Sequence, residues 1–239
     1  MNRGVNIIIK KSTFTKDLQI ENEVSEWLHK YYYSTDLFEK IEKIKQTDLQ
    51  HKGVDVYQTS YRIFKDKLSH AVDEKCAITY VKKSHDEPRL NTFAFELNYI
   101  KGNQLLDGWL FGNKYSNTEY YQVMWLWADV SQKNKWKYNY KEINRKNITR
   151  VEGLVIKKID IQNYLKKQGL NKAGIMYYRN KLMNQEKPIR LEGNQAKVQI
   201  SKYLPEKPMN VIIDSEKLRE LSIHHFVQDL PKEKNKINF

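Results

Sequence analysis

The spacing of apolar residues predicts two amphipathic helices near the start of the chain. The first, over residues 16–32, places its apolar side chains on one face and has Thr15 at the N-cap position. The second, over residues 34–46, begins at Ser34, whose hydroxyl can cap it. The inward-facing residues are Ile20, Val24, Trp27, Leu28 and Tyr31 in the first helix, and Leu37, Phe38, Ile41 and Ile44 in the second.

From Gly53 onward the apolar pattern changes to the alternation that is typical of strands. The segments 53–60, 71–81 and 91–100 each predict an extended segment with one apolar face. The segment 120–130 is apolar on both faces, which predicts a strand buried inside a sheet.

The second half of the chain mixes strand and helix patterns. Strands are expected over residues 148–161, 196–204 and 209–214, and helices over residues 160–169 and 215–222, the last capped by Ser215. This order of elements predicts an α/β protein with a central mixed β-sheet flanked by helices. A basic and aromatic stretch near residues 131–147 divides it into a core, 1–130, and a C-terminal α/β part, 131–239, that packs on the same core.

Composition adds a strong positive charge to this picture. The chain has 42 Lys and Arg against 29 Asp and Glu, a net charge of +13, which favours a polyanionic partner. Cys76 is the only cysteine, so an internal disulfide and a cysteine-built zinc site are excluded, and we expect a cytoplasmic protein. The apolar run at residues 5–9 is too short for a signal peptide or a membrane span, so no membrane is expected as a partner.

Two carboxylates are set into apolar strand patterns. Asp55 lies between Val54 and Val56, and Asp73 directly follows another apolar pair, although a buried carboxylate is costly unless its charge is compensated. Residues two apart share one face of a strand, so Asp73 and Lys75 point the same way. Pairing of the two strands would bring Asp55 to them. Because Mg²⁺ prefers carboxylate oxygens, the pattern predicts a metal ion between the two aspartates.

These residues resemble the PD-(D/E)XK nuclease superfamily, in which an acidic residue and a later (D/E)-x-K tripeptide form a metal-dependent active site. Here Gly53-Val54-Asp55-Val56 is followed by Asp73-Glu74-Lys75 within an apolar strand. The order of expected elements over residues 20–128 is also similar. The sequence departs from the pattern at two points, because no proline precedes Asp55 and because the tripeptide begins with Asp where Glu is common.

The resemblance implies a restriction-endonuclease-like core and assigns the site. Asp55 and Asp73 would hold Mg²⁺, for which Mn²⁺ can substitute, and Lys75 would assist the attacking water or the phosphate. Many members also place a glutamate on the first helix, facing the metal. Glu23 is our choice for this catalytic role, and Glu21, which flanks the other edge of the apolar face, remains the alternative.

The expected function is that of a Mg²⁺-dependent DNA endonuclease that hydrolyses phosphodiester bonds, of restriction or phage-defence type. A homodimer is the expectation by analogy. The alternative is a nucleic-acid-binding protein without catalysis, in which an aspartate and Lys75 form a structural ion pair between strands. An enzyme acting on RNA is a third reading.

Two further features bear on these alternatives. Lysines and aromatic residues alternate over 135–141, so Lys135, Trp136, Lys137 and Lys141 are expected to contact nucleic acid through charge and stacking. An edge strand protected by lysines explains the same alternation. Glu96, on the strand after the tripeptide, is either a third metal contact or a solvated residue.

Overall fold

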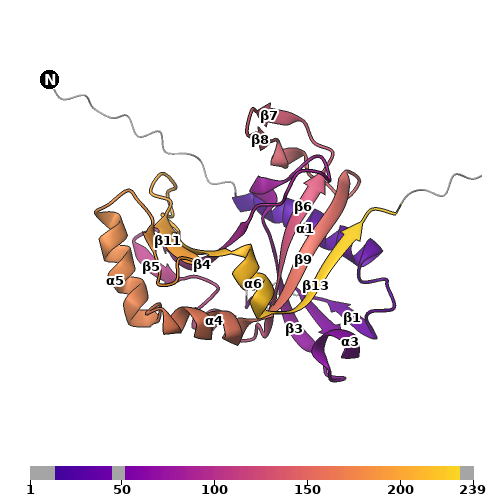
Figure 1. The fold of residues 1–239 in the computed structure, drawn as a ribbon, viewed down its shortest axis with the longest axis horizontal. Helices are drawn as coiled ribbons and strands as arrows, with labels where there is room; N and C mark the ends of the chain where they lie inside the picture. Colours follow the sequence, from indigo (N-terminus) through magenta and orange to yellow (C-terminus); the bar gives the residue numbers. More distant parts are fainter. Residues whose placement is uncertain (1–13, 45–51, 232–239) are drawn as a thin grey trace, which may run out of the picture.

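The structure, a computed structural model, describes residues 14–44 and 52–231. Its strands form two large sheets and a small hairpin (Figure 1). Sheet A contains, in spatial order, β1 (Lys40–Lys43), β2 (Val56–Thr59), β3 (His70–Cys76), β6 (Tyr120–Ala128), β9 (Ile148–Lys157) and β13 (Ser222–Asp229). Sheet B contains β10 (Ile189–Arg190), β11 (Ala196–Ile200), β12 (Met209–Asp214), β4 (Thr92–Lys101) and β5 (Gln104–Asp107).

Short connections and helices complete the described part of the chain. The hairpin pairs β7 (Gln132–Asn134) with β8 (Lys137–Tyr138). The α-helices are α1 (Phe14–Tyr31), α3 (Tyr61–Phe64), α4 (Lys158–Lys167), α5 (Lys172–Met183) and α6 (Ser215–Leu221). The 3-10 turns are η1 (Ile78–Tyr80), η2 (Asn113–Tyr115) and η3 (Tyr140–Glu142). None of these helices is long and apolar enough to cross a membrane.

Sheet A is mixed because one of its pairings is parallel. β3 runs parallel to β6, with Asp73 beside Tyr121, whereas the other pairings described for this sheet are antiparallel. Parallel neighbours cannot be joined by a tight turn, so the chain must cross over between them. Residues 77–119 make this crossover and contribute β4 and β5 to sheet B on the way.

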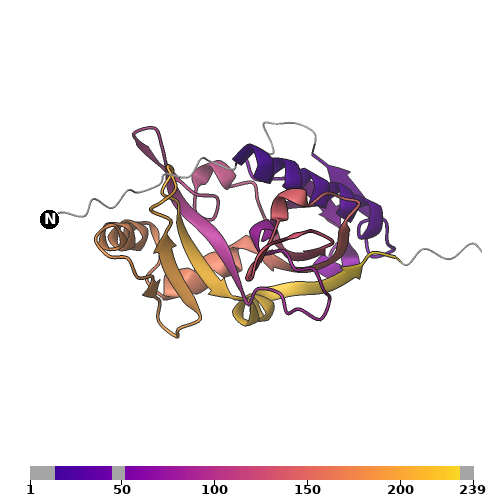
Figure 2. The ribbon, with the colours of Figure 1, turned by 90° about the horizontal axis from the view of Figure 1, so that it is seen from above.

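Sheet A lies between two packed layers. α1 covers one face, where Ile20 and Trp27 share a core with Met124 of β6. On the other face Tyr121 of β6 packs with Phe95 of sheet B and with residues of α4, α5 and α6. Figures 1 and 2 show α1 along one side of sheet A, with sheet B and α5 toward the opposite end of the molecule. Every residue of β6 is buried, which confirms the strand predicted inside a sheet.

The helix predicted over residues 34–46 is wrong in its described part. Residues 40–43 form β1, which pairs antiparallel with β2, Lys40 beside Thr59. Ile41 is half-buried between its exposed neighbours, as in an edge strand. The apolar spacing of this segment fits both the helical and the strand period, and hydrogen bonding to β2 makes it a strand. Residues 45 and 46 lie outside the described residues.

Other differences concern the C-terminal half. The strand expected over 148–161 ends at Lys157, where α4 begins, and α6 has Asp214 at its N-cap in place of Ser215. The helix α5 and the strand β13 were not predicted. Each sheet takes strands from both sides of residue 131, because β9 and β13 join sheet A, and β4 and β5 join sheet B. The α/β class with a mixed sheet flanked by helices is confirmed.

Candidate active site

The β2–β3 hairpin holds Asp55 beside the tripeptide. Asp55 comes directly before β2, and its backbone N–H donates a hydrogen bond to the carbonyl of Val72, at 3.0 Å. Its carboxylate Oδ2 accepts a hydrogen bond from the backbone N–H of Glu74, at 2.8 Å. Both bonds fix the Asp55 carboxylate against the middle of β3, as the expected strand pairing requires.

Asp73 and Lys75 lie on the same face of β3, and the Lys75 ammonium forms an ion pair with Oδ1 of Asp73. The Asp73 side chain is 1% exposed. Its second oxygen, Oδ2, is buried and accepts no hydrogen bond from a donor group of the described residues, and the Asp55 carboxylate lies within hydrogen-bond reach of the Asp73 carboxyl group. Such an oxygen is rare in a folded protein, because an unsatisfied buried acceptor costs about 1–3 kcal/mol.

Close packing of the backbone shields this oxygen. Gly53 has a φ of +75°, a conformation that residues with a Cβ rarely adopt. A Cβ at Gly53 would lie 2.7 Å from Oγ1 of Thr118 and 3.4 Å from Oδ2 of Asp73. The Thr118 hydroxyl in turn donates a hydrogen bond to the carbonyl of Gly53. Glycine at position 53 thus lets the chain pass directly over the aspartate.

The charges of the cluster oppose one another. Burial raises the pKa of Asp73 well above its usual range, the Lys75 ammonium lowers it, and the Asp55 charge raises it further. Burial alone would lower the pKa of Lys75, but the carboxylates, first Asp73 and then Asp55, raise it above its ordinary value. Lys75 therefore stays protonated, and the pair of aspartates is not fully compensated by one lysine.

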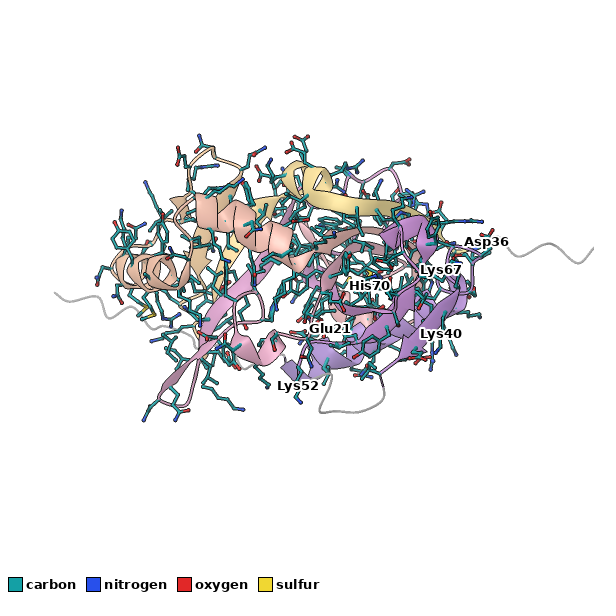
Figure 3. All side chains as sticks on the ribbon, turned by 90° about the horizontal axis from the view of Figure 1, so that it is seen from below. Glu21, Asp36, Lys40, Lys52, Lys67 and His70 are labelled. Carbon is teal, nitrogen blue, oxygen red and sulfur yellow. The ribbon has the colours of Figure 1, made fainter. Side chains whose placement is uncertain are left out.

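The first helix contributes Glu21 to this cluster. Burial raises the pKa of the Glu21 carboxyl, the Lys75 ammonium lowers it and the Asp55 charge raises it, so these three groups lie within electrostatic reach of one another. Figure 3 shows Glu21 near the middle of the molecule. Glu23 points elsewhere, because its Oε2 accepts a hydrogen bond from the backbone N–H of Arg145, at 2.9 Å. Glu23, the residue we favoured, therefore does not face the cluster, whereas Glu21, the alternative, does.

Sheet B covers the cluster from the opposite side. Burial raises the pKa of Glu96, on β4, to about 7, and the Lys75 ammonium opposes this shift. The Lys75 ammonium also lies 5.5 Å from the centre of the Trp109 ring. Sequence reasoning placed Glu96 as a further candidate and missed Trp109, because only the crossover between β3 and β6 brings the segment after β5 to this face.

The acidic side chains of the cluster are possible ligands of a divalent metal ion. No three His, Cys, Asp or Glu side chains in residues 14–44 and 52–231 form a metal site by themselves. Mg²⁺ usually needs fewer, because it keeps several waters and binds through one or two carboxylates and substrate phosphate. Asp55 and Asp73 are two such carboxylates, and Oδ2 of Asp73 accepts no hydrogen bond from a donor of the described residues. The residues present therefore fit Mg²⁺ or Mn²⁺.

The basic and aromatic residues lie apart from this cluster, on the β7–β8 hairpin, which projects beyond β6 and β9 (Figure 1). Trp136, at its turn, is 82% exposed, and the Lys135 ammonium lies 5.1 Å from the centre of its ring. Lys137 and, in η3, Lys141 are exposed. The segment is a hairpin followed by a 3-10 turn rather than the single extended strand that the alternation implied.

Comparisons with protein-family models, with curated proteins and with solved structures found no match to this chain. Function must therefore be argued from the cluster itself.

Proposed function

We propose that the chain is a Mg²⁺-dependent nuclease that hydrolyses phosphodiester bonds of DNA, of restriction or phage-defence type. The observation that carries this proposal is the close approach of two carboxyl groups, Asp55 and Asp73, with Oδ2 of Asp73 buried and without a hydrogen-bond donor in the described part of the chain. A purely structural carboxylate would be expected to have both oxygens satisfied. An oxygen kept free beside a second aspartate is what metal binding requires.

Each residue of the cluster has a part in this chemistry. Asp55 and Asp73 would hold the ion, and Glu21 and Glu96 add negative charge near Lys75. When bound, Mg²⁺ would polarise the phosphate and make a bound water more acidic. The Lys75 ammonium is held in place by Asp73 and can stabilise negative charge on a phosphate oxygen. The backbone at Gly53 limits the access of bulk water to the Asp73 carboxylate, and the Trp109 ring packs near the Lys75 ammonium.

Affinity for the substrate would come from outside this cluster. The net charge of +13 favours nucleic acid without regard to sequence. Trp136 and Lys135 offer an exposed ring and an exposed cation on a projecting hairpin, a combination that stacks on unpaired bases and contacts phosphates. Binding is therefore expected to weaken steeply as salt is added.

The rival function is nucleic-acid binding without catalysis. The ion pair between Lys75 and Asp73 favours it, because such a pair can be purely structural. That reading requires the Asp55 and Asp73 carboxyl groups to share a proton, since one lysine compensates only one of them. Cleavage assays separate the two functions.

The decisive experiment is incubation of supercoiled plasmid, linear phage DNA and single-stranded RNA with the full-length protein in Mg²⁺, Mn²⁺ or EDTA. Asp73→Asn keeps the shape of the side chain and should reduce Mg²⁺-dependent DNA cleavage at least about 10³-fold, since it removes a metal-ligand charge. Affinity for DNA, measured in EDTA, should stay within about twofold, because binding rests on the surface charge. Asp36→Asn, at an 85% exposed carboxylate, is the matched control.

The outcomes distinguish the readings. DNA binding without cleavage in any metal identifies the non-catalytic rival, and preferential cleavage of RNA identifies a ribonuclease. Cleavage that survives Asp73→Asn unchanged would overturn the assignment of the site. Defined fragments indicate a sequence-specific endonuclease, whereas a smear indicates a general one.

A further inference from the structure

A pocket of about 920 Å³ lies beside the carboxylate cluster, outside the residues assigned to it. Its walls come from the segment before β6, from one side of α4 and from the start of α5. Thr118 belongs to both places, because it lines the pocket and also donates to Gly53 above Asp73. The volume is within the range of ordinary small-molecule sites, roughly 300–1,000 Å³.

Positive charge surrounds this pocket. Four of its lining residues are lysines, Lys157, Lys158, Lys166 and Lys172. None of their ammonium groups forms an ion pair with a carboxylate of the described chain. Glu119 is the one acidic lining residue, and its carboxylate is already hydrogen-bonded to the ring of His70. The pocket therefore has uncompensated positive charge.

Two helices begin at the pocket and add to this charge. The N-terminal ends of α4 and α5 both contribute lining residues, and the amino end of a helix attracts anions. Lys157, at the N-cap of α4, makes no side-chain cap, and the amide of Lys158 donates to the backbone carbonyl of Glu119 instead. At α5, Asn171 caps the amide of Gly174.

Lys158 is the buried member of the lysine group. Its side chain is almost fully enclosed, at 7% residue exposure, and its ammonium donates to the carbonyl of Tyr115. Burial lowers the pKa of Lys158 to about 8, and the charge of Asp73 opposes this shift. An ammonium carries three donors, and among the described residues only this carbonyl accepts from it as a hydrogen-bond partner. An anionic ligand would satisfy the remainder.

The wall also contains three large apolar or aromatic side chains, beside polar residues such as Asn113 and Gln162. Phe111, Tyr120 and Ile159 line the pocket together with the lysines, and Ile159 is 49% exposed. Inorganic phosphate would leave most of this surface and most of the volume unused. A ligand with a phosphate at one end and a flat or apolar group at the other uses both.

We propose that this pocket binds a nucleoside monophosphate group, with its phosphate among the four lysines and its nucleoside against the apolar wall. Two sources offer this chemistry: a free mononucleotide, and the 5′-phosphate end of a nucleic-acid strand. The inference goes beyond the proposed nuclease function, because it uses none of the residues that would hold the metal ion.

The experiment measures binding to the full-length protein in EDTA, where no hydrolysis occurs. AMP, adenosine and inorganic phosphate are compared by isothermal titration calorimetry. AMP should bind measurably and at least about tenfold more tightly than either fragment, since only AMP uses both the cationic and the apolar wall. Labelled single-stranded DNA 12-mers with a 5′-phosphate or a 5′-hydroxyl are then compared as competitors of AMP.

Charge reversal tests the assignment to this pocket. The double variant Lys166→Glu/Lys172→Glu changes two exposed pocket lysines and should weaken AMP binding at least about tenfold. Lys101→Glu/Lys187→Glu makes the same change in net charge at two exposed lysines outside the pocket and should alter it less than about twofold. Thermal unfolding of both variants checks that they are folded.

The competition experiment separates the two sources. Preferential competition by the 5′-phosphorylated 12-mer supports a strand end as the ligand, and equal or absent competition by both 12-mers supports a free nucleotide. Absence of AMP binding, or equal weakening by both double variants, overturns the proposal. Because the metal is removed throughout, these results are independent of whether DNA is cleaved.

Discussion

On the face of β3 that is turned toward α1, Glu74 accepts a hydrogen bond from the hydroxyl of Tyr33, which also accepts from the side-chain amides of Gln58 and Gln122. On the opposite face Asp73 pairs with Lys75 at one oxygen and has no donor at the other among the described residues, with the Asp55 carboxylate close by. Both carboxylates belong to the same strand, where Asp73 is buried and Glu74 is half-buried. They differ in whether the fold satisfies them.

This difference distinguishes a polar side chain that stabilises the fold from one that is available for function. A buried hydrogen-bonded network rigidifies a core, and Glu74 is held by one, in which Oε1 of Gln58 is the acceptor without a partner among the described residues. A carboxylate left half-paired costs stability and persists only when something else makes use of it. Substitutions that act differently on the two faces of β3 test this interpretation.

The largest effect on stability is expected from Lys75→Met. This change leaves Asp73 buried without its cation and should lower the free energy of unfolding by about 3 kcal/mol, the lower end of the range for a broken buried pair. The double variant Asp73→Asn/Lys75→Met should recover most of that loss, because the neutral pair has no uncompensated charge. Urea unfolding curves give both values. Equal instability of the single and double variants would contradict the ion-pair account.

Tyr33→Phe disrupts the hydrogen-bond network on the Glu74 face of β3. It removes the hydroxyl that Glu74, Gln58 and Gln122 share and should cost about 2 kcal/mol of stability, with DNA cleavage below the unfolding transition changed less than about twofold. Tyr32→Phe is the matched control, since the neighbouring hydroxyl is buried without a partner in the described residues and its removal should cost nothing. A loss of cleavage in Tyr33→Phe, without a loss of stability, would mean that the Glu74 face, and not only the Asp73 face, takes part in function.

The two glutamates of α1 give a smaller and more selective contrast. Glu21→Gln removes a charge near Lys75 and should lower Mg²⁺-dependent cleavage about tenfold, equivalent to about 1.4 kcal/mol. Glu23→Gln, two residues away, loses only its contact with Arg145 and should change cleavage less than twofold. Rates are compared at saturating Mg²⁺ and again at limiting Mg²⁺. Equal effects of the two variants would remove Glu21 from the site.

The tripeptide on β3 and the neighbouring Asp55 could be located from the sequence because their geometry is local. Alternation along a strand places Asp73 and Lys75 on one face, and a hairpin brings Asp55 to them. The choice between Glu21 and Glu23 could not be made, since both flank the apolar stripe of α1 and only its packing on sheet A decides which one faces inward.

Longer-range features were beyond sequence reasoning. The crossover between β3 and β6 brings Glu96 and Trp109 close to Lys75. The periodicity of apolar residues does not indicate where such a crossover packs. Residues 40–43 were assigned to a helix because their apolar spacing fits either period, whereas hydrogen bonds to β2 make them a strand. The lysine pocket likewise combines three segments that are separated in sequence. Non-local pairing, rather than propensity, decides each of these cases.

His70, at the start of β3, provides the smallest and most specific test of the satisfied face. Burial would lower its pKa, but hydrogen bonds to Glu119, at 2.7 Å, and Asp66, at 2.9 Å, raise the pKa of the ring above its usual value. A raised pKa means that the protonated ring stabilises the fold below the unfolded-state value of about 6.5 and that this stabilisation is lost as pH rises through the folded-state value. His70→Gln should therefore cost about 1 kcal/mol at pH 6 and distinctly less at pH 9, measured by urea unfolding at both pH values. A cost that is equal at both values would mean that the neutral ring is the stabilising form, and the pairing with two carboxylates would then contribute nothing through charge.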